Sequence, residues 1–186
     1  MKIIAFSNNE KIWIKKAASG DSKAQRMLYE RYAGKMLSIC RQYIKDVQFA
    51  EDVMVHAFVK VFKNLDSFEH RGSFEGWVRK IMVRESISYL RKRQFVVYDD
   101  EVLENQEQSM DSSYSAFDMA YIQNEIDRLP EGYKMVFLLY AVEGYKHHEI
   151  AEMLQISEGT SKSQLFKARK LLQENLKWMV KSTGWN

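Results

Sequence analysis

The chain has 186 residues, of which 46% are hydrophobic and 28% charged, and its formal net charge is +3 at pH 7. This composition is typical of a globular protein with one domain or two small ones. No apolar run approaches the roughly 20 residues of a membrane span, and the apolar stretch IIAF near the start is too short for a secretory signal. We therefore expect a cytoplasmic protein with no membrane insertion of its own. The lone Cys40 excludes an internal disulfide and is expected to be a small buried apolar group.

The composition favours helices throughout the chain, because it has one proline, eight glycines and no alternating strand pattern. The predicted fold class is all-α, with two small helical domains at 1–93 and 118–178 and a tail at 179–186. Between the domains we expect a flexible acidic linker at 94–117. The segment from Gln94 to Asp118 has seven acids and no lysine or arginine, which is poor material for a packed core.

The first domain is predicted to contain helices at 9–19, 21–46, 47–64 and 73–93, the second of which has a potential break near Gly34.

The helix at 47–64 carries more apolar surface than one core-facing stripe needs. Its core stripe at helical spacing consists of Ala50, Val53, Ala57, Val61 and Leu65. Val55, Val59 and Phe62 add apolar surface away from that stripe. The sequence leaves two explanations open: a docking face for a partner, or a helix that is buried on most sides within its own bundle.

The helix at 73–93 is strongly basic. From Arg71 to Arg93 there are seven cations and two acids, and helical geometry places Lys80, Arg84 and Arg91 within about 40° of one another. Such a face suits the phosphates of a nucleic acid.

Aromatic residues lie close to these cations. Trp77 flanks the basic face, and Phe68 and Phe74 belong to the preceding loop. Rings beside cations are used to hold unstacked single-stranded bases, although burial in the core competes as the role of Trp77. The loop His70, Arg71, Gly72 and Ser73 is the better candidate for a pocket that takes a flipped base.

The stretch from Gly144 to Leu172 is predicted to form two short helices joined by a tight turn. Ile150, Ala151 and Leu154 recur at helical spacing on the first helix. Gln155, Ile156 and Ser157 make the turn, and the Ser157 hydroxyl can cap the next helix. This layout is typical of a helix-turn-helix reader of DNA.

The second of these helices has an apolar stripe, Leu165, Ala168 and Leu172, and a polar stripe that faces away from it. We predict that small polar groups read base edges and that cations grip phosphates. The predicted readers are Thr160, Ser163 and Gln164, and the predicted phosphate contacts are Lys162, Lys167, Arg169 and Lys170. The alternative, an ordinary solvated amphipathic helix, is disfavoured by the local excess of cations.

The neighbouring pair His147 and His148 is not a metal signature, because adjacent side chains on a helix diverge and no further ligand lies nearby. A solvent-exposed or phosphate-proximal position is expected for both. Nothing in the sequence offers a nucleophile with a positioned base or a phosphate-cradling glycine loop, so we expect no enzymatic activity, no cofactor and no metal site.

Four segments, in this order, resemble a sigma-70-family factor of the extracytoplasmic-function (ECF) type, most like those of the Bacteroidetes, and the resemblance runs from about Gly20 to Leu176. They look like the opening helices, the polymerase-binding helix, the promoter-melting and minus-ten segment, and the minus-thirty-five reader of that family. Their sequences are GDSKAQRMLYERY, AEDVMVHAFVKVFKNLDSF, FEGWVRKIMVRESISYLRKR and LPEGYKMVFLLYAVEGYKHHEIAEMLQISEGTSKSQLFKARKLL.

The resemblance implies a two-part initiation subunit that binds core RNA polymerase and promoter DNA. The first domain would dock on the clamp helices of the beta-prime subunit, and the second on the beta flap. The linker would thread the RNA exit path, where its acids imitate nucleic acid. An anti-sigma factor is a further expected partner. The implied polymerase contacts are Asp52, Val55, His56, Val59 and Phe62, and the implied single-strand contacts are His70, Arg71, Ser73, Trp77, Lys80, Arg84 and Arg91.

This chain departs from the family pattern at three places. Val55 and His56 stand where glutamine and an acid are frequent, although Asp52 remains. Arg84 replaces a common asparagine and adds a cation to the DNA face. Lys146 and His148 stand in place of small polar and lysine residues.

Two other readings stay open on the sequence. A conventional regulator would use the same helix-turn-helix to bind operators without polymerase, with the first domain as a sensor or dimerisation unit. A pure interaction adaptor would bind polymerase without choosing a start site.

Overall fold

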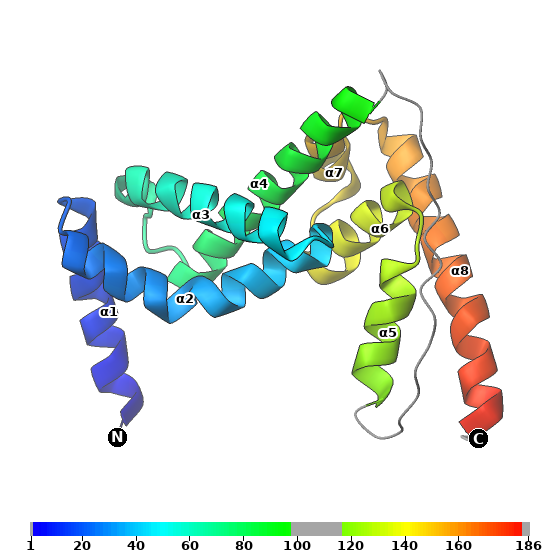
Figure 1. Cartoon of the computed structure of the whole chain (residues 1–186), viewed down its shortest axis with the longest axis horizontal. Helices are drawn as coiled ribbons and strands as arrows, with labels where there is room; N and C mark the ends of the chain where they lie inside the picture. The colour runs from blue at the N-terminus through cyan, green and yellow to red at the C-terminus, as the bar shows by residue number, and fades with distance from the viewer. Residues whose placement is uncertain (1, 98–116, 184–186) are drawn as a thin grey trace. The chain divides into compact units, whose positions relative to one another are not determined.

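The computed structural model describes the backbone of residues 2–97 and 117–183 (Figure 1), and the side chains of residues 10–92 and 121–176. Within these ranges the chain forms helices and loops and no strand, which confirms the all-α prediction. The chain divides into two compact units, residues 1–100 and 101–186. None of the described helices is long and apolar enough to cross a bilayer.

The first unit is a helical bundle in which α2 packs against α1, α3 and α4, and α3 packs against α4. Aspartates start two of its helices, because Asp21 accepts a hydrogen bond from the Ala24 N–H at 3.0 Å and Asp46 accepts one from the Phe49 N–H at 3.1 Å. The elements are α1 (Lys2–Ala18), α2 (Ser22–Tyr43), α3 (Val47–Lys63), the 3-10 turn η1 (Leu65–Ser67) and α4 (Phe74–Val97).

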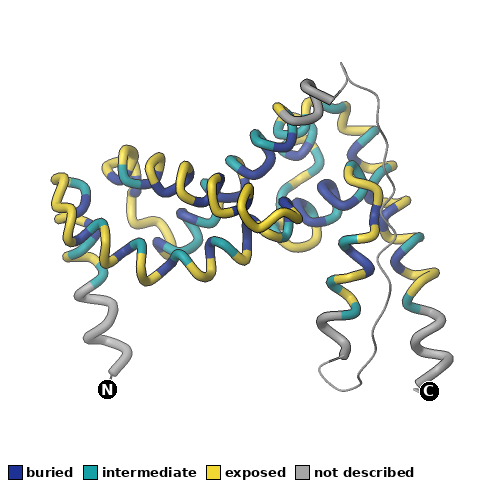
Figure 2. The backbone as a smooth tube through the Cα atoms, in the orientation of Figure 1, coloured by how far each residue is buried: buried dark blue, intermediate teal, exposed yellow. Residues whose placement is uncertain are grey.

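Buried residues of α2, α3 and α4 lie on the faces that these helices turn toward one another, and Figure 2 shows the buried stretches of the chain in dark blue. Leu28, Met36, Val61 and Met82 are fully buried there. Cys40 is also buried, as expected, and burial raises the pKa of its thiol.

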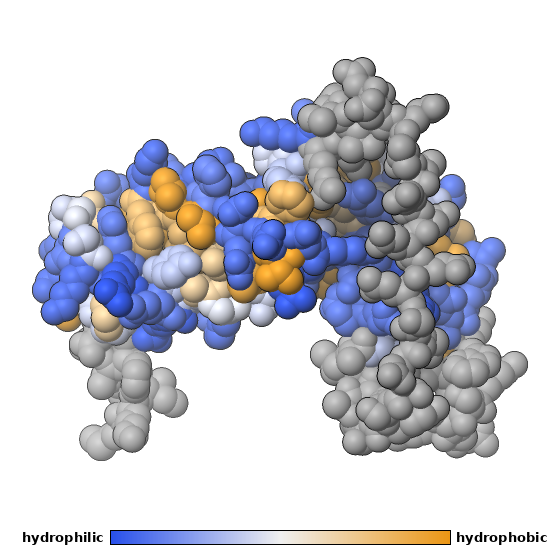
Figure 3. Space-filling model, in the orientation of Figure 1, coloured by the Kyte–Doolittle hydropathy of each residue, from blue (hydrophilic) through white to orange (hydrophobic). Residues whose placement is uncertain are grey.

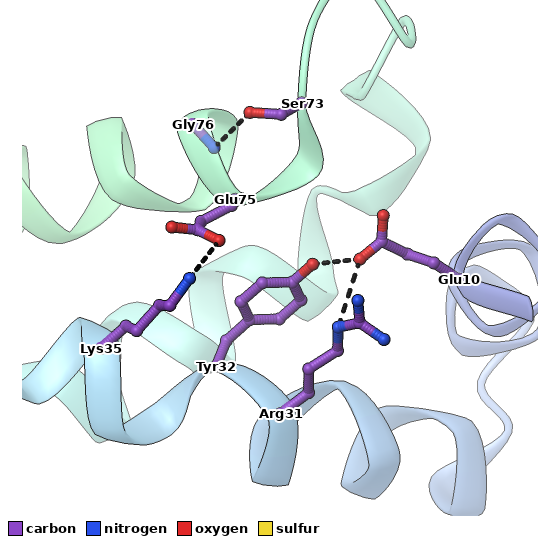
Figure 4. A network of polar contacts seen from close by, with 7 residues as sticks. All are labelled: Glu10, Arg31, Tyr32, Lys35, Ser73, Glu75 and Gly76. Carbon is purple, nitrogen blue, oxygen red and sulfur yellow. Dashed lines mark hydrogen bonds and ion pairs between the residues drawn. The ribbon is translucent and has the colours of Figure 1, made fainter. Parts of the chain in front are cut away.

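A polar network joins α1, α2 and the start of α4 (Figure 4). The Tyr32 hydroxyl donates a hydrogen bond to the Glu10 carboxylate, and the Arg31 Nε lies 3.6 Å from the same oxygen. Burial, and then this hydrogen bond, raise the pKa of Tyr32 well above its ordinary value. Lys35 Nζ pairs with Glu75 Oε2 at 2.9 Å, which ties α2 to α4. A second ion pair, Lys60 Nζ to Glu85 Oε2 at 2.7 Å, ties α3 to α4.

The second unit packs α5, α6 and α7 against the long helix α8. Its core contains Val136, Leu139, Ile150 and Ala168, all fully buried. The elements are α5 (Phe117–Asp127), α6 (Glu131–Phe137), the π-helical turn η2 (Leu138–Val142), α7 (His147–Leu154) and α8 (Glu158–Thr183).

Buried charges in this unit are paired. The Glu125 carboxylate, 2% exposed, accepts hydrogen bonds from Arg128 Nη1 at 2.9 Å and from Asn175 Nδ2 of α8 at 2.7 Å. Lys134 of α6 is buried against Asp127 of α5. Because an unpaired buried charge is costly, these contacts hold α5 against α8 and α6 against α5.

Several predicted boundaries need correction. The predicted break of α2 near Gly34 is absent, since the helix is continuous from Ser22 to Tyr43. The helix α4 ends at Val97 rather than at residue 93, so the first residues of the predicted linker are helical, and residues 98–116 lie outside the described residues. The helix α8 continues to Thr183, through most of the predicted tail.

Candidate nucleic-acid interface

The predicted helix-turn-helix is present as α7, a three-residue turn and α8. Gln155 adopts a left-handed conformation with φ 56°, which ends α7, and the Ile156 N–H donates to the Ala151 carbonyl at 3.0 Å. The Ser157 hydroxyl accepts a hydrogen bond from the Thr160 N–H at 2.9 Å. Ser157 is therefore the cap of α8, as predicted, a contact that contributes about 1 kcal/mol to helix stability.

One face of α8 is buried and the opposite face is exposed. The buried face consists of Ser161, Leu165, Ala168 and Leu172, which adds Ser161 to the predicted apolar stripe. On the exposed face lie Lys162, Ser163, Phe166, Lys167, Arg169 and Lys170.

The placement of two predicted base readers differs from expectation. Thr160 and Gln164 are half-buried and do not face fully outward. The Gln164 amide lies against Gly132 of α6. If Gly132 carried a β-carbon, that atom would lie 3.1 Å from Gln164 Nε2. The Thr160 Oγ1 lies 2.8 Å from the Ser157 hydroxyl. Both side chains therefore have structural contacts at the edge of the exposed face, whereas Ser163 and Lys167 face outward as predicted.

Phe166 is a residue that the sequence reasoning missed. It is 70% exposed, the most exposed of the large hydrophobic side chains in the described part of the chain. The signal was present, because Phe166 falls outside the stripe of Leu165, Ala168 and Leu172. An aromatic side chain that is left in water on a basic helix is available to a ligand.

Two cations of α8 pair with acids of their own helix, and two lie over aromatic rings: Lys167 over Tyr133 and Arg169 over Tyr140. Lys162 Nζ lies 2.7 Å from Glu158 Oε1, and Lys170 Nζ lies 4.0 Å from Glu174 Oε1, with both pairs exposed. The hydrogen bond with Lys162 holds the pKa of Glu158 below its ordinary value. Exposed pairs of this kind contribute little to stability because solvent screens them, so phosphates can replace the acids.

The two neighbouring histidines have different surroundings. His148 is exposed, as expected, whereas His147 is half-buried and so not fully solvent-exposed; a position near a phosphate stays a prediction for it. Its Nδ1 lies 2.9 Å from the hydroxyl of Ser161, and its ring stacks on Tyr140 with centroids 4.7 Å apart. His147 thus joins α7 to α8.

In the first unit, a pocket of about 380 Å³ lies at the start of α4, where the sequence predicts a base-binding loop. Trp77 forms part of its wall and also packs on Phe68 and Phe74, with centroids 5.4 Å and 5.8 Å away. The predicted core role and the predicted site role of Trp77 are therefore compatible. The lining residues are Ser67, Phe68, Glu69, Arg71, Gly72, Ser73, Gly76, Trp77 and Lys80.

The loop residues contribute to this pocket in different ways. The Ser73 hydroxyl accepts a hydrogen bond from the Gly76 N–H at 3.1 Å, so that it caps α4 as well as lining the pocket. Arg71 Nε lies 3.0 Å from Glu69 Oε2, and both side chains are exposed. His70 does not line the pocket; it has a positive φ of 57°, and its ring packs on Phe68 with centroids 4.6 Å apart.

The predicted cations of α4 begin at the pocket and continue along the helix away from it. Lys80 lines the pocket and is exposed. Arg84 is exposed about 6 Å further along the helix, and Arg91 is half-buried about 16 Å from Lys80, at 1.5 Å per residue. The structure thus brings Arg71, Ser73, Trp77 and Lys80 together and leaves Arg84 and Arg91 as a basic track.

The outer face of α3 is apolar and open to solvent. Val55 is 48% exposed and Val59 is 45% exposed, next to the exposed polar residues Asp52 and His56, and Figure 3 shows orange side chains along this helix. Phe62 is half-buried and stacks on Phe58, with centroids 5.9 Å apart. Of the two explanations for the apolar surplus, burial on most sides within the bundle is therefore wrong.

Comparison with known proteins identifies both units. The family model described as Sigma-70 region 2 matches residues 28–96, and the one described as Sigma-70, region 4 matches residues 119–172, together about two thirds of the chain. These two regions, in this order, are those of an RNA polymerase sigma factor.

The chain therefore belongs to the sigma-70 family, as a factor of the ECF type. It is 24% identical to the ECF RNA polymerase sigma-E factor of Haemophilus influenzae, over 88% of this chain and 93% of the relative. It is 28% identical to the ECF RNA polymerase sigma factor SigW of Bacillus subtilis, over 88% and 95%. The fold is similar to that of the sigma factor RpoE from Bartonella quintana, solved in complex with the anti-sigma factor NepR, with a TM-score of 0.54 and 23% identity over 82% of this chain and 96% of that one. The likeness to Bacteroidetes factors in particular stays a prediction.

Proposed function

We propose that this chain is a dissociable initiation subunit that directs core RNA polymerase to promoters and stabilises the opened strand. The observation that carries the proposal is the presence of two DNA-compatible faces in one sigma-family chain. One is the basic helix α8 of a helix-turn-helix, which suits duplex DNA. The other is the pocket at the start of α4, whose size and aromatic wall suit an unstacked base.

In the duplex contact, α8 enters the major groove with its exposed face. Ser163 lies on that face and can donate to a base edge, and the ring of Phe166 can contact a thymine methyl group. Thr160 and Gln164 read bases at the edge of the contact. The cations Lys162, Lys167, Arg169 and Lys170 neutralise phosphates, which gives affinity without sequence preference.

In the single-strand contact, a base leaves the stack and enters the pocket beside Trp77. Stacking on an aromatic side chain is worth about 1–3 kcal/mol per base, which offsets the cost of unpairing. Arg71 and Lys80 at the pocket rim meet the flanking phosphates, and Arg84 and Arg91 continue that track along α4.

The polymerase would be bound through the outer face of α3. Val55 and Val59 provide an apolar centre, and Asp52 and His56 provide a polar rim, which is the usual anatomy of a protein interface. The beta-prime clamp helices are the proposed partner of this face, and the beta flap is the proposed partner of the second unit.

An anti-sigma factor is the proposed regulator, since the similar RpoE of Bartonella quintana was solved bound to one. The chain would work in the cytoplasm beside the polymerase, and the chemistry of transcription would remain with the polymerase.

Transcription in vitro from a pool of genomic promoter fragments tests this proposal. Core enzyme with this chain should give defined transcript starts, absent with core enzyme alone, and the starts should share two spaced sequence elements. A gel-shift assay on the same fragments should show weak binding by the chain alone. Strong operator binding without polymerase would favour a free-standing regulator, and polymerase binding without defined starts would favour an adaptor.

A further inference from the structure

Tyr140 makes two contacts that link the π-helical turn η2 to both helices of the helix-turn-helix. Its ring stacks on His147 at the start of α7, with centroids 4.7 Å apart and an interplanar angle of 24°. The guanidinium carbon of Arg169 on α8 lies over the same ring, 5.5 Å from its centroid. Arg169 itself is exposed, so this contact directs a side chain that is otherwise in solvent.

The His147 ring that stacks on Tyr140 is itself in contact with a buried serine of α8. His147 Nδ1 lies 2.9 Å from the Ser161 hydroxyl, and Ser161 is fully buried. His147 and Tyr140 are both half-buried, so each ring has protein on one side. The π-helical turn η2 contributes to the placement of Tyr140, because a wider turn shifts the positions of the side chains that follow α6.

A long cationic side chain loses rotamer freedom when it binds a phosphate, and that loss weakens binding. A ring that already restricts the guanidinium lowers this entropic cost of binding, because the side chain is partly ordered before DNA arrives. An exposed cation–π contact alters binding by about 2–5-fold.

We propose that Tyr140 is a positioning residue that holds Arg169 ready for a DNA phosphate. This inference rests on the proposed function of α8 as the DNA-reading helix. Because phosphates carry no sequence information, the effect of Tyr140 falls on affinity and not on promoter preference.

A double-mutant cycle tests the inference, using the full chain with core polymerase on a labelled promoter fragment recovered from the transcription assay. Tyr140→Leu should weaken promoter binding about 2–5-fold, and Tyr140→Phe, which keeps the ring, should bind like the wild type. In the Arg169→Ala background, Tyr140→Leu should have no further effect, because the cation that the ring orders has been removed. The preference for this promoter over a fragment with a scrambled upstream element should not change.

Lys170→Ala provides the matched control, since Lys170 lies on the same helix but pairs with Glu174 and not with a ring. The losses from Tyr140→Leu and Lys170→Ala should multiply. Thermal unfolding of each variant checks the fold, and Tyr140→Met replaces Tyr140→Leu in the cycle if the leucine variant does not fold.

An equal loss from Tyr140→Leu with and without Arg169, or a Tyr140→Phe variant as weak as the leucine variant, would overturn the inference. A wild-type chain that forms no promoter complex with core polymerase would instead show that the proposed function is wrong, and the inference with it.

Discussion

Removal of the apolar centre of α3 should weaken binding to core RNA polymerase by a calculable amount. Val55 and Val59 are 48% and 45% exposed, so about half of each side chain remains to be buried by a partner. Complete burial of a valine contributes about 1.5–3 kcal/mol, and the exposed halves therefore contribute about 1 kcal/mol each. Alanine keeps the β-carbon, so the double variant Val55→Ala with Val59→Ala should lose less than this sum, about 1.5 kcal/mol, or roughly 10-fold in the dissociation constant.

The variant chain should fold normally. The two residues are half-exposed, and alanine has a higher helix propensity than valine, so the melting temperature should change little. Affinity for core enzyme can be measured by fluorescence anisotropy of a labelled chain, with circular dichroism as the check on folding.

Val47→Ala is the matched control, because Val47 lies on α3, is 42% exposed and is on another face of the helix. It should leave the affinity for polymerase unchanged. An equal loss in the control variant, or no loss in the double variant, would show that the outer face of α3 is not the docking face.

Further predictions concern the DNA contacts and the buried thiol. Trp77→Ala should reduce strand opening, measured as permanganate reactivity of unpaired thymines, by the equivalent of about 1–3 kcal/mol, while duplex binding by the holoenzyme is retained; unchanged opening would exclude Trp77 from the base pocket. Lys167→Ala should lower the slope of log K against log salt by about 0.9, and a slope equal to that of the wild type would mean that Lys167 meets no phosphate. Gln164→Ala should alter the preference at the upstream element, and if preference and activity both hold, Gln164 acts only through its contact with Gly132. Cys40, whose thiol pKa is raised by burial and which is therefore neutral over a wider pH range, should resist iodoacetamide at pH 8 in the folded chain and react on unfolding.

Local sequence features were sufficient to predict the helix-turn-helix. Ser157 is a cap residue directly before a basic amphipathic helix, and both the cap and the turn depend only on residues within a few positions. The loop before α4 was predictable for the same reason, since glycine and serine next to a helix start are local signals.

Contacts between distant residues were not predictable in this way. Gln164 lies against Gly132 of α6, and His147 meets Ser161 across the turn, so both side chains are less exposed than a single helix indicates. Phe166 is a different case, because its position outside the apolar stripe was visible and the same reasoning that drew attention to Val59 would have found it.

The packing of α3 against α4 through buried side chains, together with the ion pair between Lys60 and Glu85, has a consequence for where transcription starts. It joins the helix proposed to sit on the polymerase to the helix whose first turns line the base pocket. If both proposals hold, a captured base stands at a constant separation from the catalytic centre of the enzyme, because the two helices move as one piece. The number of nucleotides between that base and the first one copied would then be set by the thickness of a protein bundle and not by the DNA.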